Sequence, residues 1–275
     1  MQLTGWDDVT PNDQHIFLSP HFDDAVYSCG GTLGTLMRNG YNPLVVTVFA
    51  GMPPADVQLS PYALQTHREM GFDQTGGSAV TIRRAEDTRA LEVYHARGLW
   101  LDYLDAIYRG SPALYVCRQH VIGGDVRAED RWISQRLAHD LLAVHEHLPD
   151  TVWYCPLGVG RHVDHQIVSD CAKQLIETGA NVRLYEDFPY IMYPGALDER
   201  LREWEMDLSP IVVDISATFS LRQLATGMYA SQIRLEKDAI YSGMDSYTRS
   251  ISPARMAHTE RYWTDASKLR SSDGR

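Results

Sequence analysis

The sequence predicts an α/β fold with a mostly parallel sheet and helices on both of its faces. Runs with the composition of strands alternate with runs of helical spacing along most of the chain. Several strand-like runs are continuously apolar, as is typical of strands buried on both faces of a parallel sheet. With 275 residues and 44% hydrophobic side chains, the chain is long enough to bury one sizeable core.

The first predicted elements form a βαβ unit. Residues 15–20 (HIFLSP) predict a strand, and residues 30–40 (GGTLGTLMRNG) predict a helix that ends at a glycine. Residues 42–51 (NPLVVTVFAG) form a nearly continuous β-branched run, which predicts a buried strand. Residues 51–80 contain Pro and Gly and have weak periodicity, so we expect a long and partly irregular excursion there.

The later elements repeat this alternation. In chain order we expect a helix over 83–98, a strand over 99–106, a loop over 110–128, a helix over 131–149, a strand over 151–156, a helix over 165–180, a strand over 181–190, a strand over 210–216, a helix over 220–233 and a frayed tail over 267–275. This order predicts a single Rossmann-like domain, residues 1–275, whose ligands bind outside the C-terminal ends of the strands.

Composition narrows the classes of partner. The 25 Lys and Arg and 36 Asp and Glu give a net charge of −11, which argues against nucleic acid or an anionic membrane as the main partner. The first residues lack the features of a signal peptide, and no apolar run reaches the length of a membrane span. The four cysteines are widely spaced, so we expect reduced thiols and a cytoplasmic protein. The oligomeric state stays open, a homo-oligomer included.

Two clusters of His and Asp follow predicted strands. His21, Asp23 and Asp24 come directly after the strand over 15–20, and a second cluster, His162, Asp164 and His165, follows the strand over 151–156. Both clusters should lie at the C-terminal edge of the sheet, so they can converge although about 140 residues separate them. Each cluster alone has a plainer interpretation, because acidic side chains also cap helices or favour their first turn. Two such clusters at two strand ends favour a functional site.

The residue types suit a metal centre. Three N or O ligands and one open position make a catalytic zinc site, and His21, Asp24 and His165 can supply such ligands. Asp23 would remain as a carboxylate base, and His162 as an acid or a group that stabilises an oxyanion.

Two motifs give these clusters a family resemblance. SPHFDDAVYSCGG, residues 19–31, resembles the first motif of the PIG-L/LmbE-like N-acetylglucosaminyl deacetylases, which usually reads His-Pro-Asp-Asp with a glycine six residues later. GVGRHVDH, residues 158–165, resembles their second motif, His-x-Asp-His. The resemblance covers roughly residues 15–195 and weakens beyond them.

The resemblance implies a role for each motif residue. His21, Asp24 and His165 would hold a divalent metal, usually zinc, and Asp23 would act as the general base. His162 would stabilise the oxyanion or protonate the leaving amine.

In the same resemblance Asp164 would orient His162, while Arg83 and Asp105 would bind the sugar.

Two residues depart from the family pattern: Phe22 replaces the usual Pro, and Ala25 replaces a frequent Glu. Neither change removes a ligand, so we expect a branch of the family with a different substrate.

The function predicted from these residues is that of a metal-dependent amidase, with Zn²⁺ or another divalent metal. Its substrate would be a small N-acylated sugar or glycoside, from which it removes an N-acyl group such as acetyl. Two alternatives stay open: the same metal site could hydrolyse a non-sugar amide, or the clusters could belong to a non-catalytic module that binds metal or a nucleotide. The spare carboxylate of Asp23 argues against the module, because binding alone needs no base.

Overall fold

The computed structural model describes residues 1–72, 75–253 and 255–268, and their strands form one mixed sheet. The eight strands lie in the order β1-β4-β3-β2-β5-β6-β8-β7. They are β1 (Gln2–Leu3), β2 (His15–Ser19), β3 (Leu44–Thr47), β4 (Arg97–Trp100), β5 (Val152–Pro156), β6 (Asn181–Tyr185), β7 (Leu208–Asp214) and β8 (Thr259–Asp265). The predicted α/β fold is confirmed.

The central strands are parallel. β2 pairs in parallel with β3 on one side and with β5 on the other, so that Phe17 lies opposite both Val45 and Tyr154. β1, β4 and β6 continue the parallel part, whereas β8 is antiparallel to both β6 and β7. The C-terminal ends of β2 and β5 therefore lie side by side at one edge of the sheet.

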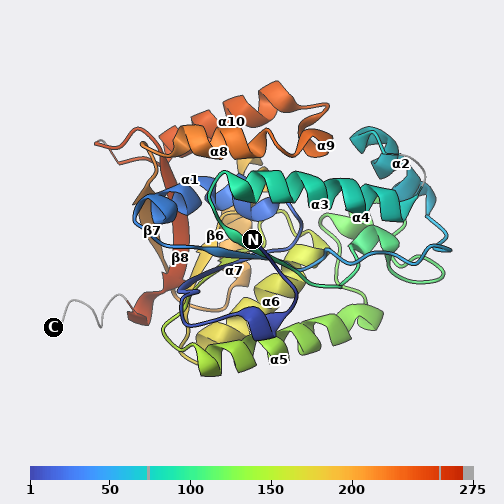
Figure 1. Ribbon diagram of the computed structural model, residues 1–275, viewed down its shortest axis with the longest axis horizontal. Coiled ribbons are helices and arrows are strands. Elements are labelled where there is room, and N and C mark those ends of the chain that lie inside the picture. The colour runs from blue at the N-terminus through green and yellow to red at the C-terminus, as the bar shows by residue number, and fades with distance from the viewer. Residues whose placement is uncertain (73–74, 254, 269–275) are drawn as a thin grey trace.

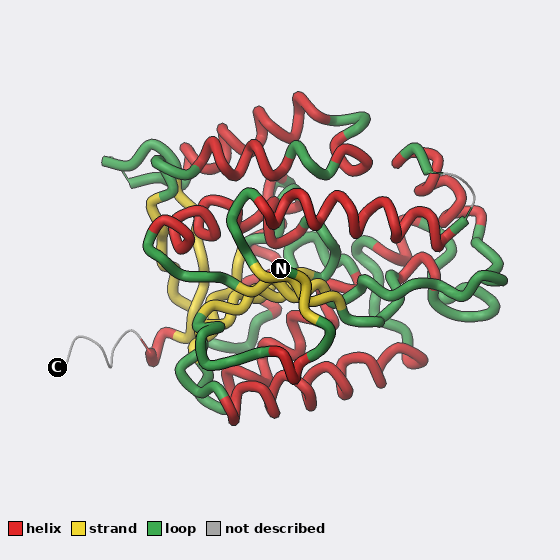
Figure 2. Tube along the Cα trace, viewed as in Figure 1, coloured by secondary structure: helices red, strands yellow, loops and turns green. Residues whose placement is uncertain are grey.

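Helices cover both faces of the sheet. They are α1 (Asp24–Arg38), α2 (Pro61–Met70), α3 (Gly76–Glu92), α4 (Arg118–Val121), α5 (Arg131–His147), α6 (Val163–Glu177), α7 (Ala196–Glu203), α8 (Phe219–Thr226), α9 (Ala230–Ile233) and α10 (Lys237–Ser250). In Figure 1, α1, α3, α8 and α10 form the layer above the sheet, and α5 and α6 form the layer below it. Figure 2 shows the strands enclosed between these two layers.

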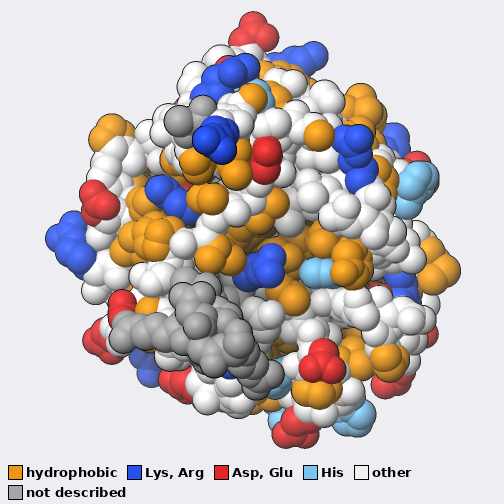
Figure 3. Space-filling model, turned by 90° about the vertical axis from the view of Figure 1, so that its left-hand side faces the viewer, with side chains coloured by type: hydrophobic (Ala, Val, Ile, Leu, Met, Phe, Trp, Pro, Cys, Tyr) orange, Lys and Arg blue, Asp and Glu red, His pale blue; other side chains and the backbone are white. Residues whose placement is uncertain are grey.

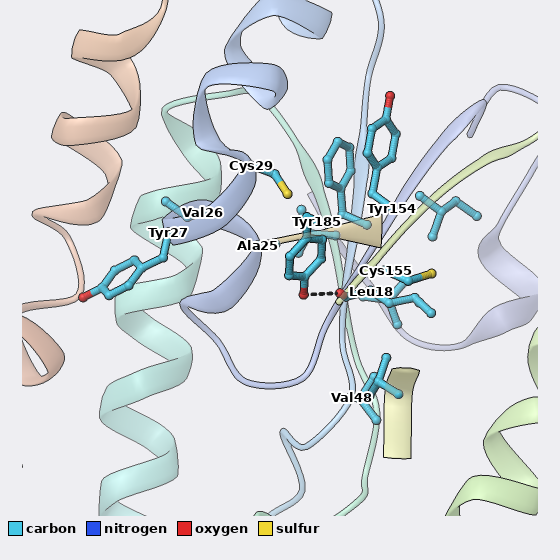
Figure 4. Packing of buried hydrophobic residues seen from close by; sticks show 14 of the residues in the cluster. Leu18, Ala25, Val26, Tyr27, Cys29, Val48, Tyr154, Cys155 and Tyr185 are labelled. Atoms are coloured by element: carbon cyan, nitrogen blue, oxygen red, sulfur yellow. Dashed lines mark hydrogen bonds between the residues drawn. The ribbon is translucent and has the colours of Figure 1, made fainter. Parts of the chain in front are cut away.

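The core lies where the central strands meet α1. All four residues of β3 are buried, as its continuous apolar run predicts. Figure 4 shows the neighbouring packing, in which the Tyr185 hydroxyl donates a hydrogen bond of 2.8 Å to the Leu18 carbonyl. The motif glycine Gly30 lies in this region, and a Cβ there would come within 2.7 Å of the Tyr94 hydroxyl. A residue with a side chain at this motif position would therefore be too close to Tyr94.

Several element bounds differ from the sequence-based predictions. α1 begins at Asp24, six residues before the predicted start, and α3 begins seven residues early, at Gly76. The strands expected over 99–106 and 181–190 lie over Arg97–Trp100 and Asn181–Tyr185 in the structure. The helix expected over 220–233 is interrupted at Gly227.

Some elements were not predicted at all. α2 lies inside the expected excursion, α4 lies inside the expected loop, and α10 and β8 form most of the chain beyond residue 236. The tail expected to fray falls mostly on residues 269–275, outside the described residues.

The surface agrees with a chain of mixed charge. Figure 3 views the side on which the C-terminus lies, and there Lys, Arg, Asp and Glu side chains are scattered among apolar ones. In the described parts of the chain, no helix is both long and apolar enough to cross a membrane. All four cysteines are free, as expected.

Candidate active site

The two predicted clusters lie at the same edge of the sheet. His21 follows the end of β2, and Asp23 is the residue before α1. On the neighbouring strand, β5 ends at Pro156, and a glycine-containing loop leads to His162, which caps α6. In this loop Gly160 has a φ of +82°, and a Cβ there would lie 2.5 Å from the Tyr190 ring. The loop can therefore turn tightly against the Tyr190 ring, and this turn places the second cluster next to the first.

At this edge Asp24 lies between nitrogen atoms of two histidines. The Asp24 Oδ2 atom lies 3.2 Å from His21 Nδ1 and 3.2 Å from His165 Nε2. The side chains are 10%, 9% and 1% exposed, respectively. We call His21, Asp24 and His165, together with His162 and Asp164, the His–Asp cluster.

The outward ring nitrogens of both histidines also meet carboxylates. His21 Nε2 lies 2.9 Å from Asp164 Oδ2, and His165 Nδ1 lies 2.7 Å from Asp187 Oδ1. The other oxygen of Asp187 accepts hydrogen bonds from the backbone N–H groups of Gly158 and Val159. Such carboxylates fix the orientation of a histidine and leave its other nitrogen free as a ligand.

Asp164 does not sit as the resemblance implied. We expected its carboxylate to orient His162, but the carboxylate takes hydrogen bonds from His21 Nε2, from Arg109 and from the Ala106 N–H. The backbone N–H of Asp164 is the group that contacts His162, donating to Nδ1 at 3.2 Å. Asp164 thus orients His21, because the capping geometry of α6 turns its side chain away from the preceding ring.

Arg83 bridges the remaining predicted residues. Its guanidinium lies 3.2 Å from Asp23 Oδ1 and 3.6 Å from Asp105 Oδ2. All three side chains are 11–14% exposed, slightly more than the side chains of His21, Asp24 and His165. The predicted base and the two predicted sugar-binding residues therefore form one continuous polar wall.

Other groups of side chains in this cluster can also hold a cation. Among the described residues, donor atoms lie within 4.8 Å of one another in His21, His162 and His165, and also in His21, Asp105 and Asp164. These sets share His21 with the predicted trio. The geometry therefore marks the cluster as a candidate metal centre and leaves more than one choice of third ligand.

Burial and charge set the protonation of the cluster. Burial lowers the pKa of both His21 and His165, but neighbouring carboxylates outweigh it, so the pKa of His21 is well above its usual range and that of His165 is about 9. Burial opposes ionisation of Asp24 as well, yet the charge of His165 holds its pKa well below its usual range. Burial and the charge of His21 keep the pKa of His162 well below its usual value. Burial raises the pKa of Asp23.

Sequence reasoning missed Asp187 and Arg109. Asp187 stands two residues after β6, so the rule that sites form at strand ends could have identified it, but the strand was expected to continue to residue 190. Arg109 carried no local signal.

The chain is similar to several known proteins. The family model described as "PIG-L: GlcNAc-PI de-N-acetylase" matches residues 16–176. A 2'-N-acetylparomamine deacetylase of Niallia circulans is 32% identical over 188 residues, which cover 64% of this chain and 66% of that protein. A 2'-N-acetylparomamine deacetylase of Streptomyces fradiae is 29% identical over 274 residues, covering 91% of this chain and 89% of that protein. The chain thus spans about two thirds of the first relative and most of the second.

A solved structure extends the match to the whole fold. The deacetylase–bog complex from the biosynthesis pathway of teicoplanin superposes with a TM-score of 0.76 at 28% identity, covering 90% of this chain and 96% of that chain. The family match runs from β2, before the first motif, into α6, after the second. Because it covers more than half of the sequence, the chain belongs to the PIG-L family.

Proposed function

We propose that the protein is a metal-dependent N-deacetylase that hydrolyses the acetamido group of an amino sugar or its glycoside. The observation that carries this proposal is the convergence of His21, Asp24 and His165 beside the separate carboxylate of Asp23. The named activities of the relatives, on acetylated amino sugars in natural products, agree with it.

Two distances between the proposed ligand atoms suit a zinc-sized ion. Ligands of a tetrahedral ion with bonds of about 2.0–2.1 Å lie roughly 3.3 Å apart, and Asp24 Oδ2 lies 3.2 Å from each of its two nitrogen neighbours. Each histidine has a carboxylate on its outward nitrogen, which orients the ring, and the inward nitrogen would become a ligand when a metal ion displaces its proton. A divalent ion held there supplies a Lewis acid that polarises the amide carbonyl and lowers the pKa of a water molecule.

Asp23 is the proposed general base. It lies outside the trio of donors, and burial raises its pKa, which makes it a better proton acceptor near neutral pH. The guanidinium of Arg83, 3.2 Å from Oδ1, holds the carboxylate in place. Asp23 then takes a proton from the water that attacks the amide carbon.

His162 is the proposed donor to the oxyanion. Its Nδ1 accepts the N–H of Asp164, so in the neutral ring the proton must be on Nε2. A protonated Nε2 has no lone pair for a metal, although the ring lies near those of His21 and His165. His162 therefore stands beside the proposed metal centre and donates a hydrogen bond to the charge that develops on the acyl oxygen.

Arg83 and Asp105 are the proposed sugar-binding residues, since they pair with each other in the polar wall beside the proposed base. The two departures from the family pattern act behind this wall. Phe22 is only 2% exposed, and its ring lies 5.3 Å from the Arg83 guanidinium. Ala25 is fully buried. We propose that Phe22 changes how Arg83 is supported, and so changes substrate choice without touching the substrate.

The proposal also covers the number of domains and the cellular compartment of the protein. The eight strands form a single sheet, so we propose that residues 1–275 make one domain. The free cysteines fit a reducing compartment such as the cytoplasm.

Acetate release tests the proposed function. The purified protein should release acetate from N-acetylglucosamine or 2'-N-acetylparomamine, should stop when the metal is chelated, and should recover when Zn²⁺ is restored. The Asp23→Asn variant is the matched control for a contaminating hydrolase. Release of acetate only from non-sugar amides would favour the alternative substrate class, and no amide hydrolysis by the metal-loaded protein would contradict the proposal.

A further inference from the structure

Arg109 is a buried cation that takes no direct part in the proposed reaction. It follows the short helix η2 (Ala106–Tyr108) and is only 4% exposed. Its Nη2 atom donates a hydrogen bond to Asp164 Oδ1, and its Nε atom lies 3.1 Å from Asp130 Oδ2. Burial of a cation is costly unless charged partners compensate for it. The two carboxylates therefore make the burial of Arg109 possible.

The guanidinium of Arg109 is incompletely hydrogen-bonded. Its Nε and Nη1 atoms make no hydrogen bond within residues 1–72, 75–253 and 255–268. Arg200 is buried to a similar degree, at 6% exposure, yet its Nε, Nη1 and Nη2 atoms each donate a hydrogen bond. An arginine that only holds the fold together should resemble Arg200. Incomplete pairing of a buried side chain is more typical of a functional region.

Two aromatic rings restrict how the guanidinium of Arg109 can turn. Its central carbon lies 5.1 Å from the centre of the Phe49 ring and 5.2 Å from the centre of the Tyr115 ring. Both rings are buried. A planar guanidinium packs against aromatic rings in a way that the compact ammonium group of lysine cannot reproduce. Arg109 is therefore held in one orientation, with Nη2 directed at Asp164.

Asp164 has a partner on each of its carboxylate oxygens. Oδ1 accepts the hydrogen bond from Arg109, whereas Oδ2 accepts from the Ala106 N–H at 3.1 Å and lies 2.9 Å from His21 Nε2. Ala106 and Arg109 belong to one short segment, so this segment contacts both oxygens. Without the contact to Arg109, the carboxylate would be held through Oδ2 and could turn about it.

The orientation of Asp164 matters because its other partner is a proposed metal ligand. His21 Nδ1 lies 3.2 Å from Asp24 Oδ2, on the side of the proposed ion, and Nε2 faces Asp164. A carboxylate on the outward nitrogen sets the rotation of such a ring. The Phe49 ring that contacts Arg109 also lies 6.1 Å from the His21 ring. Arg109 is thus linked to His21 through one carboxylate and one shared aromatic ring.

The other side of Arg109 is anchored as well. The Tyr115 hydroxyl donates to Asp130 Oδ2 at 2.8 Å and accepts from the Arg127 N–H at 3.1 Å. Asp130 directly precedes α5, so the carboxylate beside Arg109 Nε has a fixed place at the start of that helix. Arg109 therefore connects the start of α5 to the His–Asp cluster.

We propose that Arg109 is a positioning residue of the metal centre, which holds Asp164 in the orientation that directs His21 toward the metal ion. The proposal rests on the proposed deacetylase function, because it requires His21 to be a metal ligand. Arg109 itself touches neither the ion nor the substrate. The site uses the planar shape of its side chain as well as its charge.

Metal affinity tests the role of the planar group. Arg109→Lys keeps the positive charge but loses the packing against the two rings. We expect Zn²⁺ to bind about tenfold more weakly, at the lower end of the effect of residues that orient ligands, as measured by competition with a chelator. Arg222→Lys is the matched control, because Arg222 is 2% exposed and pairs with Glu260 outside the cluster. It should leave Zn²⁺ affinity unchanged.

Asp130→Asn is a second variant for the same measurement. It removes the charge beside Arg109 Nε and leaves the pair of Arg109 and Asp164 balanced in charge. The variant should therefore fold even if Arg109→Lys does not. We expect Zn²⁺ to bind about threefold more weakly, because Asp130 acts one contact further from the metal.

A double-mutant cycle tests the route through Asp164. In the Asp164→Asn background, Arg109→Lys should change Zn²⁺ affinity by less than about twofold, because the carboxylate through which Arg109 acts is already gone. If Arg109→Lys weakened binding in that background as much as in the parent protein, Arg109 would act by another path, and the inference would be overturned.

A measurement on the metal-free protein isolates the position of His21. The NMR signals of its ring, assigned with the His21→Gln variant, should shift in Arg109→Lys and stay in place in Arg222→Lys. Unshifted signals in Arg109→Lys would overturn the inference.

The outcomes separate this inference from the proposed function. Parent-like Zn²⁺ affinity in both Arg109→Lys and Asp130→Asn would overturn the inference alone and leave the deacetylase function in place. A parent protein that binds no Zn²⁺ and releases no acetate would contradict the deacetylase function, and with it any role of Arg109 at a metal centre.

Discussion

The protein buries carboxylates in two regions, and the two regions use them differently. In the His–Asp cluster, Asp24 lies between two imidazole nitrogens, each turned toward it by another carboxylate. At the junction of α1 and β8, Glu260 is just as buried, at 3% exposure, but it is surrounded by donors. It accepts hydrogen bonds from Gly31, Thr32 and Tyr262 and pairs with Arg222 at 3.2 Å.

The difference shows why burial of charge alone does not mark a functional site. A buried carboxylate whose lone pairs all meet N–H or O–H groups is complete and holds the structure together. A buried carboxylate that faces imidazole nitrogens can take part in a metal site, because an imidazole releases its proton when it binds a metal ion. The Glu260 region is of the first kind, and the His–Asp cluster is of the second.

Removal of a proposed ligand should produce the largest effect. His165→Ala deletes one of the inward nitrogens, so we expect more than about 100-fold weaker metal binding, because the outer partners of such ligands alone contribute 10–100-fold. His162→Ala is the matched control and should keep near-stoichiometric metal while kcat falls strongly. Metal analysis of the two purified variants measures the contrast. Equal metal loss in both would mean that His162 is a ligand.

Loss of the base comes next. Asp23→Asn keeps the shape of the side chain and should keep the metal, but it cannot accept the proton of the attacking water. We expect kcat to fall by roughly 10²–10⁴-fold with little change in KM. Turnover close to that of the parent protein would move the role of base to another residue.

The Glu260 region should respond in stability, not in catalysis. Glu260→Gln leaves the buried Arg222 without its carboxylate, which we expect to reduce the free energy of unfolding by about 3 kcal/mol. Urea denaturation measures the loss, and kcat of the folded variant should be unchanged. A large loss of kcat at full folding would show that the two regions are not functionally separate.

The outer carboxylates of the cluster should have an intermediate effect. Asp187→Asn removes the charge from the carboxylate that meets His165 Nδ1, while the amide oxygen can still accept from the Gly158 and Val159 N–H groups. We expect metal affinity to fall 10–100-fold, measured by competition with a chelator. Asp198→Asn, on the surface helix α7, is the control and should have no effect.

The convergence of the two clusters was predictable because it depends on topology. Strand ends of a parallel sheet share one edge, so His21 and His165 could be expected together although they are far apart in sequence. The partners of Asp164 were not predictable, since they depend on the side-chain directions that the start of α6 imposes.

The strand β8 was missed for a related reason. β8 contains two charged residues, Glu260 and Arg261, and charged residues are typical of a surface. In the structure Glu260 accepts hydrogen bonds from α1, and Arg261 donates to Glu186. α2 is different, because its local signals were present. Ser60 caps its first turn, and Gly71 ends it in the left-handed conformation. That helix was predictable from the sequence, whereas the partners of β8 were not.

A third buried carboxyl group, that of Asp87, differs in its contacts from both Asp24 and Glu260. Its replacement should have the smallest effect. It is fully buried and accepts hydrogen bonds from Trp100 and Tyr229, both neutral donors. Burial raises its pKa from 3.8 to about 7, so between these values the folded protein holds a proton that the unfolded chain releases. The stability that this group contributes is therefore fully present below about pH 4 and is lost as the pH rises through 7.

Asp87→Asn should remove this pH dependence, because the amide keeps the shape and stays neutral. We expect the free energy of unfolding of the parent protein to fall, relative to the variant, by about 1–2 kcal/mol between pH 5 and pH 7. Urea denaturation at the two pH values measures the difference, and Asp150→Asn, in an exposed turn, is the control that should show none. A constant difference between parent and Asp87→Asn at both pH values would mean that Asp87 is ionised throughout, with a positive partner like that of Glu260.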